Sequence, residues 1–166
     1  MDIYFLRHGK AAELGDPGVT DDFSRSLTAK GIEEMEAQAA VMERLGIGPD
    51  AILTSPLTRA KQTAEVVANR LGRKKSLDVC DELAPGCDLE RLGRLVGRHA
   101  SAKSILVVGH EPDLSTMIGE LVGRGGARVE MKKGGLARVE LRGSVRAGAG
   151  TLGWLVPPRV LLGGKD

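Results

Sequence analysis

Aromatic side chains are scarce in this chain of 166 residues, which has two phenylalanines, one tyrosine and one tryptophan. The hydrophobic core must therefore be built from aliphatic residues and methionine. The scarcity also argues against nucleic-acid binding of the kind that stacks bases on aromatic side chains. We accordingly expect no nucleic-acid partner.

The chain also lacks an excess of charge of either sign. Its 24 lysines and arginines stand against 22 aspartates and glutamates, which gives a formal net charge of +2. A surplus this small does not indicate a surface for nucleic acids or membranes. Any positive charge that serves a function must be a local cluster.

Cysteines and long apolar runs are equally few. Cys80 and Cys87 are too few for a disulfide framework and lack the Cys-x-x-Cys spacing of zinc and redox sites, so we interpret them as free thiols. No secretory signal pattern stands at the N-terminus, and no window approaches the ~18 apolar residues of a membrane span. We expect a cytoplasmic protein with no membrane partner and a single domain over residues 1–166.

Short apolar runs predict the strands of a mostly parallel sheet at residues 3–6, 51–53, 77–79 and 104–108. Each run ends in polar or glycine residues, as a buried strand does when its carboxyl end reaches the surface. Helical patterns lie between the runs, whereas residues 134–142 and 150–156 follow one another without a helix and predict a β-hairpin. The expected fold class is α/β, with a central sheet flanked by helices on both faces and an antiparallel C-terminal edge hairpin.

Capping residues predict where the helices begin. Thr28 is the expected N-cap of a helix that buries Ile32, Met35, Ala39, Met42 and Leu45. Ser55 is the expected N-cap of a second helix with Pro56 in its first turn, Asp88 caps a third, and a fourth begins at Pro112.

The sequence also makes predictions for two segments outside these helices and strands, a loop and the C-terminal tail. Residues 9–26 read as a long loop over the end of the first strand, and loops of that length in compact domains are usually functional. The chain ends in Pro157-Pro158 and a Gly-Lys tail, and we expect this tail to fray.

Two motifs resemble functional signatures without their structural context. Residues 148–153 have the Gly-x-Gly-x-x-Gly spacing of dinucleotide sites, but Trp154 and two prolines follow where a helix would have to begin, so we interpret the motif as a hairpin turn. His110 and Glu111 lack the second histidine of a zinc-protease helix. We therefore expect no metal and no cofactor.

Basic and imidazole side chains gather at the ends of the predicted strands. Arg7 and His8 end the first strand, Arg59 falls just after the second, His110 ends the last, and Glu82 lies in the loop after the third. Because the carboxyl ends of parallel strands meet at one edge of a sheet, we expect these five side chains to converge in one cleft. Two arginines and two histidines around one point suit a dianion such as phosphate.

The motifs around these residues resemble a known family. They are Leu6-Arg7-His8-Gly9, Ser55-Pro56-Leu57-Thr58-Arg59-Ala60-x-Gln62-Thr63 and Val108-Gly109-His110-Glu111. In this order they resemble the three signatures of the histidine phosphatase superfamily, which has the phosphoglycerate-mutase-like fold. Further segments look like the SixA-type phosphohistidine phosphatase branch: Asp22-x-x-Arg25-x-Leu27-Thr28, Glu82-Leu83-x-Pro85 and Trp154-Leu155-x-Pro157-Pro158.

The resemblance implies a role for each strand-end residue. His8 would be the nucleophile that takes the phosphoryl group, and Arg7, Arg59 and His110 would form the phosphate pocket. The residue types agree with this chemistry, because a neutral imidazole can attack phosphorus when one ring nitrogen keeps its lone pair. Glu82 matches the carboxylate that protonates the leaving oxygen in many relatives, although a structural role stays open.

Arg25 has two open interpretations. It lines the rim of the pocket and binds substrate there, or it forms a salt bridge with Asp21 or Asp22.

The expected activity is that of a metal-independent phosphatase with a phosphohistidine enzyme intermediate. Its partner would be a phosphorylated protein, such as a phosphohistidine-carrying signalling domain, and its product inorganic phosphate. The cations of the pocket would take the place of Mg²⁺. A phosphatase of small phosphomonoesters is the main alternative, and a non-catalytic phosphate-binding module is a further one.

Overall fold

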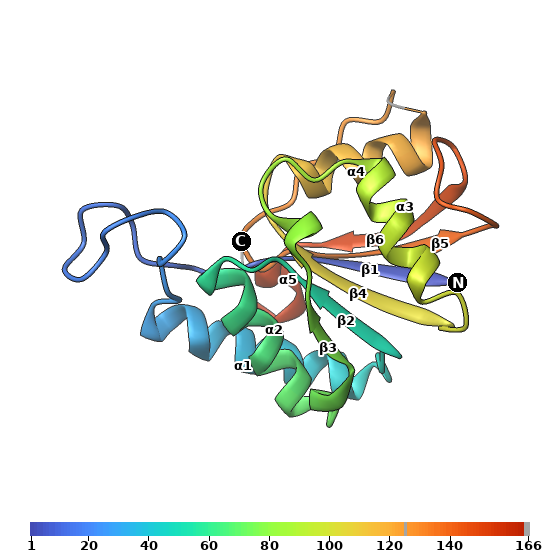
Figure 1. Cartoon of the computed structure of the whole chain (residues 1–166). Helices are drawn as coiled ribbons and strands as arrows, with labels where there is room; N and C mark the ends of the chain where they lie inside the picture. The colour runs from blue at the N-terminus through green and yellow to red at the C-terminus, as the bar shows by residue number, and fades with distance from the viewer. Residues whose placement is uncertain (125, 165–166) are drawn as a thin grey trace.

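In a computed structural model, which describes residues 1–124 and 126–164, the chain folds around a six-stranded sheet with the order β3-β2-β4-β1-β5-β6 (Figure 1). The strands are β1 (Asp2–Arg7), β2 (Ala51–Thr54), β3 (Leu77–Val79), β4 (Ser104–Gly109), β5 (Leu136–Leu141) and β6 (Gly150–Val156). Neighbouring strands from β3 to β1 pair in parallel, whereas β5 pairs antiparallel with both β1 and β6. The predicted α/β class and the C-terminal hairpin are confirmed.

Helices cover both faces of the sheet (Figure 1). The α-helices are α1 (Ala29–Arg44), α2 (Thr58–Arg70), α3 (Leu89–Arg98), α4 (Asp113–Gly123) and α5 (Pro158–Leu161), and two 3₁₀ turns are η1 (Lys74–Ser76) and η2 (Asp81–Leu83). Successive residues of a strand face opposite sides of the sheet. Accordingly Phe5 packs into the core under α3 and α4, while Leu6 packs into the core under α1 and α2.

The predicted α1 is confirmed, but its buried face is narrower than expected. Thr28 accepts a hydrogen bond from the Gly31 amide at 3.0 Å, which makes it the N-cap. Met35, Ala39 and Met42 are buried. Ile32 and Leu45 are 37% and 61% exposed, because Ile32 lies at the edge of the stripe and Leu45 follows the last helical residue.

The start of α2 corrects a sequence prediction. The helix begins at Thr58, its N-cap is Leu57, and no side chain caps it. The Ser55 hydroxyl is instead 2.8 Å from His110 Nε2. The other two predicted starts are confirmed, since Asp88 accepts from the Arg91 amide and α4 follows Pro112.

The C-terminal segment contains a short helix that the sequence did not predict. Pro158 begins the short helix α5, a position that suits a residue with a fixed φ and no N–H to bond. Residues 165 and 166 of the predicted tail lie outside the described residues. The glycine motif at residues 148–153 runs from the hairpin connection into β6, and no helix follows it directly.

Two further observations concern the predictions from composition. Cys80 and Cys87 are buried free thiols, as predicted. In the described part of the chain, every helix is too short or too polar to cross a membrane.

Candidate active site

Four of the predicted site residues meet at the carboxyl edge of the sheet. The parallel pairing of β1 with β4 sets Arg7 opposite Gly109, so that His8 and His110 follow side by side. Their ring centroids are 5.2 Å apart. Arg59, in the first turn of α2, donates from Nε to His8 Nε2 at 3.3 Å. Both histidines and Arg59 are at most 5% exposed.

The tautomer of His8 follows from its neighbours. Its Nδ1 lies 2.7 Å from the carbonyl oxygen of Gly9, and because a carbonyl can only accept, Nδ1 carries the proton. The Nε2 lone pair is then the acceptor for Arg59. Burial lowers the pKa of His8 to about 3, against a smaller opposing effect of the Gly9 hydrogen bond, so the imidazole is neutral at pH 7.

His110 is held by Ser55, which the sequence analysis predicted to be a helix N-cap. Its Nε2 lies 2.8 Å from the hydroxyl of Ser55, which is itself fully buried. Burial, followed by the charge of Arg59, lowers the pKa of His110 to about 4. The sequence feature that could have indicated this role is the position of Ser55 as the first residue of the Ser-Pro-Leu-Thr-Arg motif, but the same position also predicts a helix N-cap.

Neither imidazole should titrate near neutral pH. The folded pKa values of about 3 and about 4 place protonation of His8 and His110 well below pH 5.5. In long-range ¹H–¹⁵N spectra, we expect the ring signals of both residues to stay constant between pH 5.5 and 8, with His8 as the Nδ1–H tautomer. An inflection near pH 6.5 in either ring would contradict the buried, neutral pair.

A hydrogen-bonded bridge joins the strand-end loop to α2. The Gly9 amide donates to Thr63 Oγ1 at 3.0 Å, and that hydroxyl donates to the carbonyl of Arg59 at 2.7 Å. Gly9 must be glycine, because a Cβ there would lie 2.7 Å from Met35 Cγ. This bridge fixes His8 and Arg59 relative to each other.

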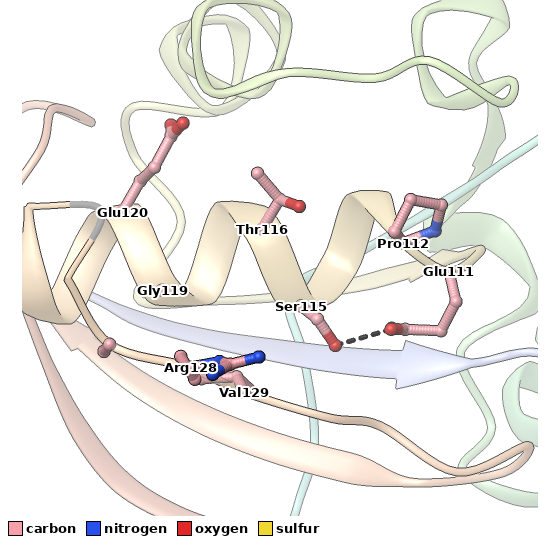
Figure 2. A pocket seen from close by; sticks show the side chains of 9 residues that line it. Glu111, Pro112, Ser115, Thr116, Gly119, Glu120, Arg128 and Val129 are labelled. Atoms are coloured by element: carbon pink, nitrogen blue, oxygen red, sulfur yellow. Dashed lines mark hydrogen bonds between the residues drawn. The ribbon is translucent and has the colours of Figure 1, made fainter.

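Arg7 is anchored from the opposite side of the site. Its Nη1 donates to the carbonyl of Met131 at 2.7 Å, and the Met131 amide donates to Ser115 Oγ at 3.2 Å. Ser115 donates in turn to Glu111 Oε2 at 2.6 Å. Figure 2 shows this last contact in a cavity of about 370 Å³ beside the site, with the Glu111 carboxylate directed along α4 toward Ser115.

Glu82 is not joined to this group by any hydrogen bond or ion pair that the described residues make. It lies on η2, and its Oε1 is 2.7 Å from Arg98 Nη2 at the end of α3. The hydrogen bond from Arg98 contributes to a pKa below the ordinary glutamate value, after the larger contribution of the backbone hydrogen bond. The carboxylate therefore faces an arginine of α3.

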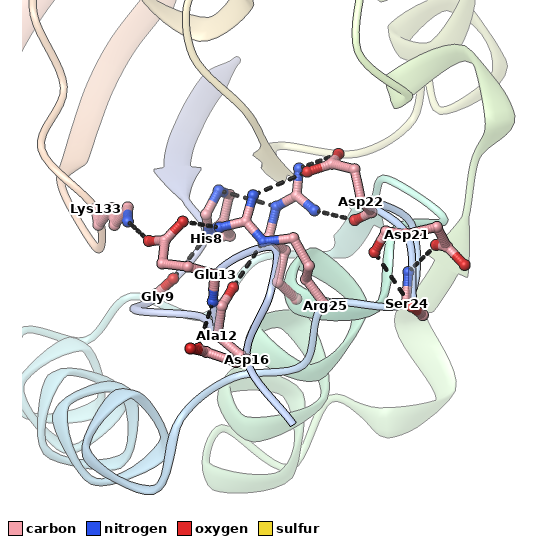
Figure 3. A network of polar contacts seen from close by, with 11 residues as sticks. His8, Gly9, Ala12, Glu13, Asp16, Asp21, Asp22, Ser24, Arg25 and Lys133 are labelled. Carbon is pink, nitrogen blue, oxygen red and sulfur yellow. Dashed lines mark hydrogen bonds and ion pairs between the residues drawn. The ribbon is translucent and has the colours of Figure 1, made fainter. Parts of the chain in front are cut away.

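Arg25 makes the salt bridge that was one of its two interpretations. Its Nη1 and Nη2 each lie 2.8 Å from a carboxylate oxygen, of Asp22 and of Glu13 respectively (Figure 3). Its Nε donates to the carbonyl of Ala12 at 2.6 Å. Asp21, the other predicted partner, accepts from the Ser24 amide instead.

The contact between Asp22 and Arg59 is a feature of the pocket that the sequence did not predict. Arg59 donates from Nη1 to the Asp22 carbonyl at 2.6 Å and from Nη2 to its Oδ2 at 3.0 Å. The sequence offered only the spacing to Arg25, which pointed to a local salt bridge. The pairing with Arg59 joins residues 37 positions apart, and no periodicity encodes it.

The arrangement suits nucleophilic attack on an anion. Arg7 and Arg59 supply fixed positive charge beside a neutral imidazole whose outer nitrogen keeps its lone pair, which is what phosphoryl transfer requires of its surroundings. Among the described residues, no group of three or more His, Cys, Asp or Glu could hold a metal ion.

Comparisons with known proteins point in the same direction. A family model described as "Histidine phosphatase superfamily (branch 1)" matches residues 3–84. An uncharacterised protein of Picosynechococcus sp. is 36% identical over 140 residues, 82% of each chain. The phosphohistidine phosphatase SixA of Escherichia coli is 29% identical over 160 residues, 95% of this chain and 94% of that protein. A structure of the protein histidine phosphatase SixA complexed with tungstate superposes with a TM-score of 0.84 and 28% identity, over 97% of this chain and 99% of the other.

Proposed function

Since this chain belongs to the histidine phosphatase superfamily and resembles its SixA-type branch, we propose that it is a metal-independent phosphatase that removes the phosphoryl group from phosphohistidine on a protein. His8 is the nucleophile in this proposal, and Arg7, Arg59 and His110 bind the phosphoryl oxygens. The single observation that supports it most is the His8 ring, held by Gly9 at Nδ1 with Nε2 directed at the Arg59 guanidinium.

The reaction proceeds in two displacements at phosphorus. The Nε2 lone pair of His8 forms an N–P bond as the bond from phosphorus to the leaving group breaks, and the leaving group takes a proton from solvent. Water then attacks the phosphohistidine, inorganic phosphate leaves, and the electron pair returns to Nε2. Arg7 and Arg59 stabilise the charge on the phosphoryl oxygens in both transition states, the main contribution to catalysis of this kind.

The relatives support an oxyanion in this pocket. The SixA structure is complexed with tungstate, and it shares its fold with almost the whole of this chain. We propose that the corresponding ligand here is the phosphoryl group of the substrate and, after hydrolysis, inorganic phosphate.

The surface beside the pocket favours a protein as substrate. The carbonyl of Phe23 accepts from the Thr58 amide at 3.1 Å, which places this residue of the long loop next to Arg59. Its side chain is 55% exposed. A folded partner can bury such a side chain and use the binding energy in the transition state, whereas a small phosphomonoester is too short to do so.

The test compares two substrates on one enzyme preparation. We expect kcat/KM for a phosphohistidine-carrying protein domain to exceed that for a free small phosphomonoester by at least about 10²-fold, which corresponds to about 2.7 kcal/mol of transition-state binding. Phe23→Ser should reduce kcat/KM for the protein substrate and leave kcat/KM for the small substrate unchanged. Phe5 cannot be used for this comparison, because its side chain is buried in the core.

The alternative activity makes the opposite prediction. Equal values for both substrates, or a preference for one small metabolite, would replace the protein-substrate proposal by a phosphatase of small phosphomonoesters. Binding of inorganic phosphate without turnover of either substrate would indicate a phosphate-binding module.

Glu82 should matter little to the rate. Because its carboxylate is paired with Arg98, we expect Glu82→Gln to lower kcat by less than about threefold on both an alkyl and an activated aryl phosphate. A general acid would give a different pattern, since an alkyl leaving group needs the proton far more than an aryl one. A selective loss on the alkyl phosphate would restore Glu82 to that role.

A further inference from the structure

Asp22 holds the guanidinium of Arg59 by two points of contact. Its backbone carbonyl and its carboxylate accept from Nη1 and Nη2, while Nε remains directed at His8. An arginine has five N–H donors, and Asp22 and His8 together engage three of them. One N–H group on each Nη is therefore not used by these contacts, so the guanidinium can bind a phosphoryl group while its two bonds to Asp22 persist.

Asp22 is itself fixed from its other side. Arg25 binds its Oδ1, and Arg25 is also held by Glu13, which accepts from Lys133 Nζ at 3.1 Å (Figure 3). The Arg25 side chain is only 13% exposed. A chain of ion pairs thus runs from Lys133 through the long loop to Arg59, which in turn donates a hydrogen bond to His8.

We propose that Asp22 is a positioning residue, which orients Arg59 for the phosphoryl group bound at His8. The proposal rests on the function proposed above, because Arg59 needs orientation only if it binds a phosphoryl group. An arginine side chain has many accessible rotamers, and fixing it before the substrate arrives removes the entropic cost of ordering it from the binding step. Asp22 acts through Arg59 and does not touch the reacting atoms.

A second effect of the same carboxylate opposes this one. A negative charge near the pocket repels a phosphate dianion, although solvent screening weakens that repulsion. The Asp22 side chain is 49% exposed and lies between two guanidinium groups, both of which screen its charge. We therefore expect orientation to outweigh repulsion.

The experiment separates geometry from charge with two variants of one residue. Asp22→Ala removes the side-chain acceptor, whereas Asp22→Asn keeps an oxygen that can accept from Arg59, removes the charge and replaces the acceptor of Arg25 by an amide NH₂ group. We expect Asp22→Ala to weaken the binding of inorganic phosphate, measured by calorimetry, about tenfold and to lower kcat/KM by a similar factor. Asp22→Asn should recover most of both losses. Tighter phosphate binding in both variants would show that repulsion dominates and would overturn the proposal.

Two controls exclude a general effect on the loop. Asp21→Ala removes a hydrogen bond within the same loop that does not involve Arg59, and it should leave phosphate binding within about twofold of the wild type. In an Arg59→Ala background, adding Asp22→Ala should change phosphate affinity by less than about twofold, because the group to be oriented is gone. A further tenfold loss in that background would mean that Asp22 supports the fold and not Arg59.

Failure of this inference and failure of the proposed function give different results in these measurements. A wild-type protein that binds phosphate but does not hydrolyse phosphohistidine refutes the proposed substrate, and the comparison of the Asp22 variants still decides the positioning role.

Discussion

Replacing His8 with alanine should abolish the covalent phosphoenzyme and lower kcat by about 10³-fold or more. The physical reason is that His8 Nε2 keeps its lone pair beside the Arg59 guanidinium, whereas His110 Nε2 is hydrogen-bonded to Ser55. Without the nucleophile, only direct attack by water remains, and the residual rate comes from the arginines alone.

The measurement is a quench experiment with ³²P-labelled substrate. Wild-type enzyme quenched in alkali should keep its label, and enzyme quenched in acid should lose it, as a phosphohistidine does. His8→Asn serves as a second variant, because its amide N–H can replace Nδ1–H as the donor to Gly9. His99→Ala, a partly exposed histidine at the end of α3, is the matched control and should label normally. A label that persists in both His8 variants, or that maps to His110, would refute the assignment.

Arg59→Ala should lower kcat by about 10² to 10³-fold, the effect of removing one fixed donor from a developing anion. Arg59 is 5% exposed and is held in place by His8 and Asp22, so its charge is oriented before the substrate binds. Arg59→Lys should recover less than about a tenth of the lost activity, because an ammonium group keeps the charge but not the planar array of donors.

Steady-state kinetics on the purified variants would test this prediction. Arg70→Ala, at the opposite end of the same helix and paired only with Glu43 on the surface, is the control for effects on α2. A loss under about threefold in Arg59→Ala would place Arg59 outside the reaction. Thermal unfolding of each variant separates a loss of catalysis from a loss of structure.

The strands and the convergence of the site were predictable from sequence because each depends on a short pattern. An apolar run that ends in Arg7 and His8, or in Gly109 and His110, indicates a buried parallel strand and the side chains at its end. Parallel topology then brings those ends together without further information. The positions of both histidines and of Arg59 follow from these two steps.

The missed features depend on partners far away in the chain. Ser55 has the residue type of a helix cap, and only the arrival of His110 on β4 decides that its hydroxyl binds an imidazole. Asp22 likewise pairs with Arg59 across the fold. Glu82 pairs with Arg98 of α3, a partner that the sequence did not indicate, and its part in the reaction stays a prediction. Local sequence patterns do not show which of several partners, distant in the chain, a side chain will contact.

The hydrogen bond from Arg59 to His8 also bears on which molecules can react with the resting enzyme. In this structure, the lone pair needed for attack accepts a hydrogen bond from the Arg59 guanidinium. An incoming phosphoryl group can free it, because its anionic oxygens accept from the guanidinium more strongly than a neutral ring nitrogen does. An uncharged electrophile has no anionic oxygen to accept the hydrogen bond of Arg59, so the lone pair of His8 stays engaged. If His8 is the nucleophile, as proposed, this contact makes negative charge on the substrate the condition for freeing its lone pair, and selection for the substrate begins before any bond to phosphorus forms.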